Sequence, residues 1–306
     1  MTRQEHVEPM LREILHSSDL GRIVLGYSEP RPMVLCWKIT ERKSDILLPL
    51  VFNGRYAYDC TIDWGDGTRP ETIAGSPVYE RVHHQYRPQH VGTTVRIEIR
   101  GSVPAFDCSY VADTQGLESI EWGDVGRLGT QHPTQGFFSG CTGLVRVEEP
   151  PDIRLVPSAA QMFAHAPKFN QAIGDWFVGD NCLTDTSRMF WGAKKFNQPL
   201  EEWNVASVTN MSSMFGEARA FSQPLGRWDT QGVTQMRGMF YRAMAFNQDL
   251  SGWHIQNVRD MDCMFQGAVS FDTDLNWVAS PGTSTSMMFA DRPSPMRDLA
   301  FQVAAA

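Results

Sequence analysis

The segment from Val208 to Trp228 reads VTNMSSMFGEARAFSQPLGRW, and its pattern recurs through the second half of the chain. The Met-Phe pair inside it, Met214-Phe215, returns so that successive Phe residues are 27, 25, 25, 25 and 24 positions apart. These residues are Phe163, Phe190, Phe215, Phe240, Phe265 and Phe289, and one further step of 25 backwards reaches Phe138. Self-similarity at a fixed period of roughly 20 to 50 residues predicts a stacked repeat array.

The spacing of apolar residues inside one unit indicates a short helix. Apolar side chains recur at intervals of three and four, at Met211, Met214, Phe215, Ala218 and Phe221. Such intervals place side chains on one face of a helix, here of about two to three turns. Pro224 ends this helix, because proline lacks a backbone donor and disfavours helical geometry in the residue before it. A unit this short cannot bury its apolar face alone, so we expect the units to stack as a solenoid.

Two other repeat positions carry Trp and a polar pair. The Trp residues are Trp176, Trp203, Trp228, Trp253 and Trp277, and the pairs are Asn170-Gln171, Asn197-Gln198, Ser222-Gln223 and Asn247-Gln248. We interpret the Trp residues as a buried ladder. We interpret the polar pairs as framework groups that hydrogen-bond from one turn to the next. The alternatives are an aromatic row that stacks on sugars and a carboxamide row that contacts a ligand.

The repeated pattern VTxMxxMFxxAxxFNQxLxxW resembles the 25-residue repeat of BspA-like leucine-rich-repeat surface proteins. The first unit, Phe138-Ser-Gly-Cys-Thr-Gly-Leu144, is similar to the FxxCxxL core of the wider leucine-rich-repeat group. The segments 117–124 and 150–153 resemble the stretches that precede such arrays. The resemblance covers about residues 106–290. It implies a curved scaffold for protein–protein contact or adhesion, with no catalytic residues.

Upstream of the repeats, the sequence indicates a β-rich module. Segments rich in β-branched and aromatic residues lie between turn formers at residues 33–39, 46–52, 58–62, 78–86 and 94–99. This pattern predicts an antiparallel β-sandwich. The run Asp63-Trp64-Gly65-Asp66-Gly67-Thr68, followed by His84-Gln85-Tyr86 and Gly92-Thr93-Thr94-Val95, resembles a PKD-like, and so Ig-like, sandwich with its WGDG turn, HxY strand and GTYxV strand. This second resemblance covers about residues 30–101.

Carboxylates and imidazoles near this turn raise the question of a metal site. The residues concerned are Asp63, Asp66, His83, His84 and His90. Asp63 and Asp66 lack the alternating spacing of a calcium loop, and adjacent residues such as His83 and His84 point to opposite faces of a strand. We therefore expect the Asp side chains to cap the turn and one His to pack under it, with no metal and no cofactor. Metal binding by this set is the alternative that the sequence leaves open.

Charge and composition exclude several classes of function. With 27 Lys and Arg against 35 Asp and Glu, the formal net charge is −8, so a nucleic-acid partner is not expected. No apolar run approaches the length that spans a bilayer, and no signal peptide is recognisable, which favours an intracellular location. The family resemblance implies a cell-surface or extracellular location instead. The six Cys residues show no paired spacing, so we expect neither zinc ligation nor a disulfide framework.

The predicted fold class is α+β, with an antiparallel β-sandwich followed by an α/β leucine-rich-repeat-like solenoid. The predicted domains are an N-terminal helical segment at residues 1–29, the sandwich at 30–101, a connecting segment at 102–136, a solenoid of six to seven units at 137–290, and a C-terminal cap or tail at 291–306.

No enzyme motif is present, so we expect a non-enzymatic scaffold that binds a protein partner. The residues predicted to contact it are variable and polar, and lie between framework positions: Arg188, Lys194, Lys195, Glu217, Arg219, Arg237, Tyr241 and Arg242. The alternatives are a cell-surface or glycan adhesion module and a structural subunit of a larger assembly.

Overall fold

The computed structural model describes residues 30–41, 44–51, 56–76, 82–110, 114–123, 136–148, 156–291 and 301–303. The chain divides into two compact units, Met1–Arg31 and Pro32–Ala306. The predicted helical segment at residues 1–29 lies outside the described residues, as do segment 150–153 and most of the predicted C-terminal cap. The fold described below is therefore that of the second unit.

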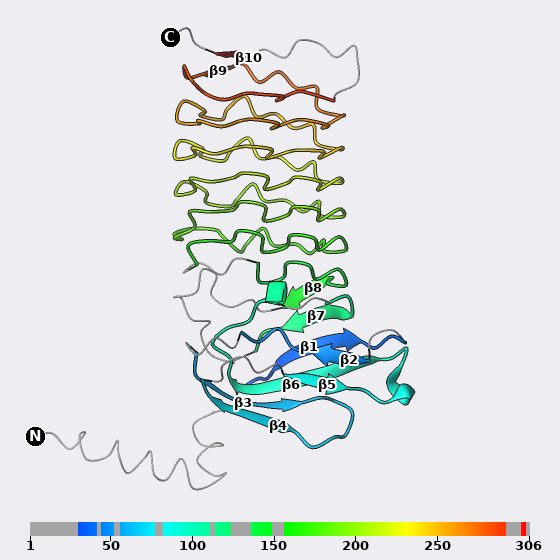
Figure 1. Cartoon of the computed structure of the whole chain (residues 1–306). Helices are drawn as coiled ribbons and strands as arrows, with labels where there is room; N and C mark the ends of the chain where they lie inside the picture. The colour runs from blue at the N-terminus through cyan, green and yellow to red at the C-terminus, as the bar shows by residue number, and fades with distance from the viewer. Residues whose placement is uncertain are drawn as a thin grey trace, which may run out of the picture. The chain divides into compact units, whose positions relative to one another are not determined.

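Short β-strands form the N-terminal part of this unit. They are β1 (Met33–Lys38), β2 (Asp45–Leu47), β3 (Tyr58–Asp63), β4 (Glu71–Gly75), β5 (His83–Gln85), β6 (Thr94–Ser102), β7 (Leu117–Glu121) and β8 (Arg146–Glu148). One open sheet has the strand order β4-β3-β6-β1-β7-β8, and a second pairs β2 with β5 (Figure 1). All of these pairs are antiparallel except β7 with β8, which is parallel.

Alternation of side chains decides which face of each strand is buried. On β6, Val95, Ile97 and Ile99 are buried while the residues between them are more exposed. On β3, Tyr58 and Ile62 are buried in the same way. Burial of each such apolar side chain stabilises the fold by about 1.5–3 kcal/mol. A shift of one residue would turn these side chains to the opposite face, so their burial fixes the strand register.

The predicted α+β class is wrong. The described residues contain no α-helix, and their helical elements are two short 3₁₀ turns, η1 (Pro88–His90) and η2 (Cys108–Tyr110). In the N-terminal part, strands form close to the predicted segments, but the large sheet is mixed because β8 joins β7 in parallel. The described part of the second unit therefore consists of β-strands followed by stacked coils of turns, and it ends in the parallel pair β9 (Trp277–Ala279) and β10 (Phe301–Val303).

Each repeat unit forms one coil whose backbone donors alternate between two directions. Around Phe215, every second N–H group bonds back into its own turn, and the N–H groups between them bond to the following coil. The bonds within the coil are Met214 N–H to Met211 O, Gly216 N–H to Ser213 O and Ala218 N–H to Phe215 O, and those to the following coil are Ser213 N–H to Arg237 O, Phe215 N–H to Met239 O and Glu217 N–H to Tyr241 O. The stack in Figure 1 is held by this ladder.

The predicted helix over Met211–Phe221 is replaced by these turns, for a reason visible in the backbone angles. Ser213 has a φ of 57° and Glu217 a φ of 54°, whereas an α-helix needs a negative φ at every residue. The same two positions have positive φ in other coils, at Gln161 and His165, Arg188 and Gly192, Gly238 and Arg242, and Cys263 and Gly267. Successive turns also bring side chains three and four apart to one face, so the apolar spacing alone did not distinguish the two structures.

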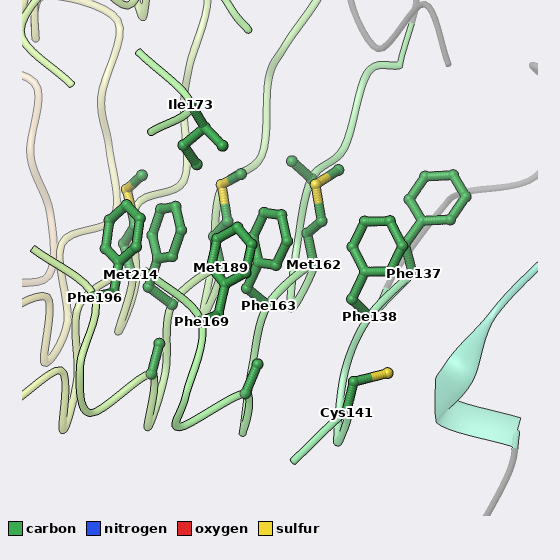
Figure 2. Packing of buried hydrophobic residues seen from close by; sticks show 14 of the residues in the cluster. Phe137, Phe138, Cys141, Met162, Phe163, Phe169, Ile173, Met189, Phe196 and Met214 are labelled. Atoms are coloured by element: carbon green, nitrogen blue, oxygen red, sulfur yellow. The ribbon is translucent and has the colours of Figure 1, made fainter. Parts of the chain in front are cut away.

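Stacked rings fill the interior of the array. The central Phe residues lie parallel from coil to coil, for example Phe190 over Phe215 at a centroid separation of 5.6 Å. Within a coil, Phe215 and Phe221 stack at 4.0 Å. Figure 2 shows this ring stack with Met162, Met189 and Met214 in a row beside it. The core is therefore continuous along the stack, as the repeat pattern predicted.

The Trp residues that close the coils form the predicted buried ladder. Trp203, Trp228, Trp253 and Trp277 are each 3% exposed. Each donates its indole N–H to a carbonyl oxygen of the coil before it, as in Trp228 to Leu200 at 3.0 Å. This bond satisfies a buried donor that would otherwise cost about 1–3 kcal/mol. These four indoles are consequently not available as a sugar-stacking row.

The polar pairs form a hydrogen-bonded ladder along one edge of the array. The side-chain oxygen of Asn197 accepts from the backbone N–H of Ser222 at 2.9 Å and from the side-chain amide of Gln223 at 3.1 Å. Asn170 makes the same two bonds to the coil of Asn197, and Ser222 and Asn247 continue the series. The prediction that these residues hydrogen-bond from one turn to the next is confirmed, although no helix precedes them.

Candidate interaction surface

The coils expose one edge, which we call the turn edge: the positions from three residues before the central Phe to five residues after it. In the coil of Phe190, Arg188, Lys194 and Lys195 are exposed while the Phe190 ring is buried. Three of the predicted contact residues, Arg188, Glu217 and Arg242, occupy left-handed positions of this edge, with φ of 54°, 54° and 52°. The residues that the sequence predicted to contact a partner therefore lie on the turn edge.

Trp191 is the one Trp of the chain that is not buried, all nine lying within the described residues. Its ring stacks on Tyr241, two coils further on, with centroids 5.9 Å apart and planes within 7°. The coil between them carries Gly216, where a Cβ atom would lie 2.3 Å from the Trp191 ring. The missing side chain at Gly216 is what lets two aromatic rings from non-adjacent coils meet on the surface.

Arg242 extends this aromatic pair. Its guanidinium carbon lies 5.1 Å from the centre of the Tyr241 ring, within the range of a cation–π contact. The guanidinium also approaches the carboxylate of Glu217 at 4.0 Å. Gly267, in the next coil, leaves room for the stem of Arg242, since a Cβ there would lie 2.9 Å from its Cγ atom. The structure thus brings together three predicted residues, Glu217, Tyr241 and Arg242.

The remaining predicted cations differ in their partners. Arg188, Lys194, Lys195 and Arg219 are exposed and form no ion pair within the part of the chain that the structure describes. Arg237 does not share this property, because its guanidinium donates to the Asp262 carboxylate at 3.0 Å. The turn edge around Trp191 is therefore cationic, although the whole chain carries a net charge of −8.

Sequence reasoning missed Trp191 and two apolar residues of the same edge. Met244 and Val269 are 39% and 38% exposed, and they occupy the position that Lys194 and Arg219 hold in earlier coils. The backbone N–H of Ala245 donates to the carbonyl oxygen of Arg219 at 3.2 Å, so these two coils are adjacent there. A signal was present for Trp191, since it lies outside the repeat positions that carry Trp.

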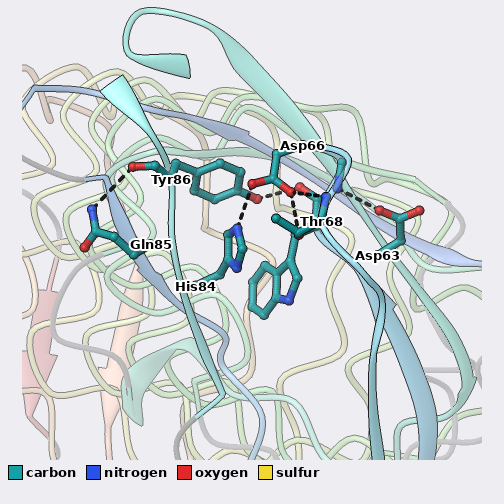
Figure 3. A network of polar contacts seen from close by, with 8 residues as sticks. Asp63, Asp66, Thr68, His84, Gln85 and Tyr86 are labelled. Atoms are coloured by element: carbon teal, nitrogen blue, oxygen red, sulfur yellow. Dashed lines mark hydrogen bonds and ion pairs between the residues drawn. The ribbon is translucent and has the colours of Figure 1, made fainter. Parts of the chain in front are cut away.

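The WGDG turn is a closed polar network (Figure 3). Asp66 accepts from the hydroxyl of Thr68 at 2.6 Å and lies 2.8 Å from the imidazole Nε2 of His84. His84 stacks on Trp64 with centroids 4.7 Å apart, and the Tyr86 hydroxyl donates to Trp64 O at 2.6 Å. Burial raises the pKa of Asp66, but the hydrogen bonds from Thr68 and His84 outweigh it and lower the pKa to about 2.

The other three residues considered as metal ligands have different neighbours. Asp63 accepts from the backbone N–H of Gly65 at 2.9 Å, and His83 lies 3.3 Å from the exposed carboxylate of Asp45. His90 has an edge-on ring contact with Tyr86 instead. The prediction that Asp side chains cap the turn and one His packs under it is confirmed. In the described residues no group of three or more His, Cys, Asp or Glu side chains is placed to hold a metal ion.

A polar groove is lined by residues that do not belong to the turn edge. It has a volume of about 610 Å³ and is lined by carboxamide, hydroxyl and backbone groups of three successive coils, including Gln231, Gln256, Asn257, Arg259 and Thr283. The side-chain amide of Asn257 donates a hydrogen bond to the carbonyl oxygen of Gln231 at 2.8 Å. The groove offers donors and acceptors but no exposed aromatic ring.

The stacked coils, the ring ladders and the exposed turn edge define a repeat-array protein. The sequence model of the family described as "Mycoplasma protein of unknown function, DUF285" matches residues 134–231 and 184–300, together more than half of the chain. The chain belongs to this family, which is the family of BspA-like repeats. No curated protein and no solved structure matches the chain. Among the described residues, no helix has the length and hydrophobicity needed to cross a bilayer.

Proposed function

We propose that the repeat array is a non-enzymatic scaffold whose turn edge binds another protein. The observation that carries the proposal is the Trp191–Tyr241 stack, which is partly exposed in a chain that buries its other eight Trp residues. Trp, Tyr and Arg dominate the binding energy of protein interfaces, and the Trp191–Tyr241–Arg242 cluster combines all three.

The rigid backbone of the coils supports the same proposal. Each ring of the pair is attached to a coil whose N–H groups bond to the next coil, so the two rings are held in place before a partner arrives. Preorganised aromatic side chains lose little conformational entropy on binding. The polar networks described above also have structural roles in turns and ladders, which supports a function in binding rather than in catalysis.

We further propose that the family membership extends to the surface-protein character implied by the BspA-like pattern, with a cell-surface location. We also propose that residues 30–101 are related to PKD-like modules. This proposal rests on the WGDG turn, in which Asp66 contacts His84.

Affinity capture with the immobilised full chain tests the binding proposal. Proteins captured from the native source by the wild-type chain are compared with those captured by the double variant Trp191→Ala/Tyr241→Ala. The matched control is Gln89→Ala, an exposed residue outside the repeat coils. We expect a specific protein to be lost with the double variant and retained with the control. Equal capture by all three chains would show that this edge is not the binding surface.

The polar groove favours a second candidate function, glycan adhesion. Carboxamide, hydroxyl and guanidinium groups such as those of Gln256, Thr283 and Arg259 are suited to hydroxyl-rich ligands. A glycan array probed with wild type and with Gln256→Ala/Arg259→Ala tests it. Binding that the double variant loses supports adhesion, and an array without binders removes this candidate.

A further inference from the structure

The turn edge changes character along the stack. In the position four residues after the central Phe, the side chains are Lys194, Arg219, Met244 and Val269 in successive coils. The position two residues before the Phe carries a cation at Arg188 and the 56% exposed Met287 in the last coil, with Ser213, Gly238 and Cys263 between them. The first row therefore runs from cationic to apolar, with the Trp191–Tyr241 stack beside the transition.

We infer that this edge binds an extended peptide segment that is acidic at one end and apolar at the other. The inference rests on the proposed function and specifies the partner's chemistry. The acidic end lies over Arg188, Lys194 and Arg219, which have no ion-pair partner within the described residues. The apolar end covers Met244 and Val269, and the aromatic stack contacts the chain between them.

The dimensions of the edge set the length of the segment. Lys194 and Val269 are three coils apart, about 14 Å at the usual strand spacing of ~4.8 Å. An extended chain covers that distance in about four to five residues. An acidic cluster separated from an apolar residue by this number of positions therefore matches the edge in register.

Charge favours a short acidic peptide over a long polyanion. The turn-edge cations that have no ion-pair partner within the described residues end with the coil of Phe215, because Arg237 and Arg242 in the next coil face the carboxylates of Asp262 and Glu217. A nucleic acid or a sulfated glycan needs available positive charge along its whole track. The net charge of −8 also repels a long polyanion. A peptide with only one acidic end gains the local attraction without opposing this wider field.

Selection from a random twelve-residue peptide display library tests the inference. The library is panned separately on the full wild-type chain, on Lys194→Glu/Arg219→Glu and on the control Arg87→Glu, an exposed cation outside the repeat coils. We expect wild type and control to enrich peptides with two or more acidic residues followed by an apolar residue. The double variant loses that enrichment. Blue-shifted emission from the buried Trp ladder verifies that each variant is folded.

The best selected peptide is then titrated by fluorescence anisotropy. We expect the dissociation constant to rise at least tenfold for Lys194→Glu/Arg219→Glu and as NaCl increases from about 50 to about 500 mM. Met244→Ser/Val269→Ser should weaken binding at both salt concentrations. Absence of acidic enrichment, its persistence on the double variant, or binding of heparin or oligo(dT) in place of peptides overturns the inference. If the Trp191→Ala/Tyr241→Ala chain still loses a captured protein in such a case, the ligand chemistry is wrong and the binding function stands.

Discussion

The indole ring of Trp191 occupies the space that a side chain at Gly216 would need. A Cβ atom at Gly216 would lie 2.3 Å from two ring carbons, and the ring reaches past that position to Tyr241. A surface contact between the first and third of three coils thus depends on the absence of a side chain in the second.

Gly216→Ala should therefore displace Trp191 and break its stack on Tyr241. Because an aromatic pair contributes about 0.5–1.5 kcal/mol, the free energy of unfolding should fall by no more than about this amount. The near-ultraviolet circular dichroism of Trp should change clearly. Gly252→Ala is the matched control, since its Cβ would meet only a carbonyl oxygen at 3.3 Å. An unchanged Trp signal in Gly216→Ala would contradict the packing described here.

Asn197→Ala removes the acceptor for two donors of the next coil. The backbone N–H of Ser222 and the side chain of Gln223 lose their shared partner, so we expect a loss of about 1–3 kcal/mol in the free energy of unfolding. Urea denaturation measures it. Asn197→Asp keeps the acceptor oxygen and should be closer to wild type. Equal losses in the two variants would argue against the ladder.

Truncation of the central ring should cost more in the middle of the stack than at its end. Phe215 is fully buried and stacks on Phe190, Phe221 and Phe240. We expect Phe215→Ala to cost about 3–5 kcal/mol. Phe289 is only partly buried and stacks on Phe265. Phe289→Ala should therefore cost less in thermal or urea unfolding, and the opposite order would contradict a core that continues along the stack.

Acid should destabilise the fold through Asp66. The pKa of its carboxyl is lowered from 3.8 to about 2, so the folded state favours the charged form. This contribution is present above about pH 4 and is lost as the pH falls toward 2, with a magnitude on the order of 1–2 kcal/mol. Asp66→Asn should show a smaller decrease in stability than wild type across this pH range. Identical pH profiles would show that the contact with Thr68 and His84 does not stabilise the carboxylate.

Thiol reactivity should separate the cysteines by burial. Burial raises the pKa of Cys60 to about 11, and it also raises that of Cys108, which lies beside Cys141. Cys182 is exposed. At about pH 8, native protein should react with an aromatic disulfide reagent first at Cys182, with Cys60 and Cys108 reacting only after unfolding. Peptide mapping of the labelled sites checks this order, and rapid labelling of Cys60 would contradict it.

The sequence was sufficient to predict the stacking but not the local backbone. A period near 25 residues identifies Phe215, Trp228 and Asn197 as framework positions, because each must meet its own counterpart in the next coil. It does not say whether the chain between them turns as a helix. That depends on the left-handed backbone at Ser213 and Glu217, and neither residue type signals a positive φ.

The candidate surface was predictable only in part. Variable polar positions identified Tyr241, Glu217 and Arg242, which the structure brings together. The stack of Trp191 on Tyr241 joins residues 50 positions apart through a gap at Gly216, and this relation appears only when the coils are superposed. The parallel pairing of β7 with β8 was missed for a similar reason, since its partners are distant in the sequence.

The alternating hydrogen-bond ladder gives the array a modular surface chemistry. Every coil presents nearly the same donors and acceptors to its neighbour, so loss or duplication of one whole unit leaves the backbone pairing intact. The exposed side chains on either side of the change would then lie beside different residues. Loss of the coil of Phe215, for example, would bring Trp191 directly beside Tyr241. Unequal recombination between repeats can therefore change the recognition surface in a single step while the hydrophobic interior keeps its register.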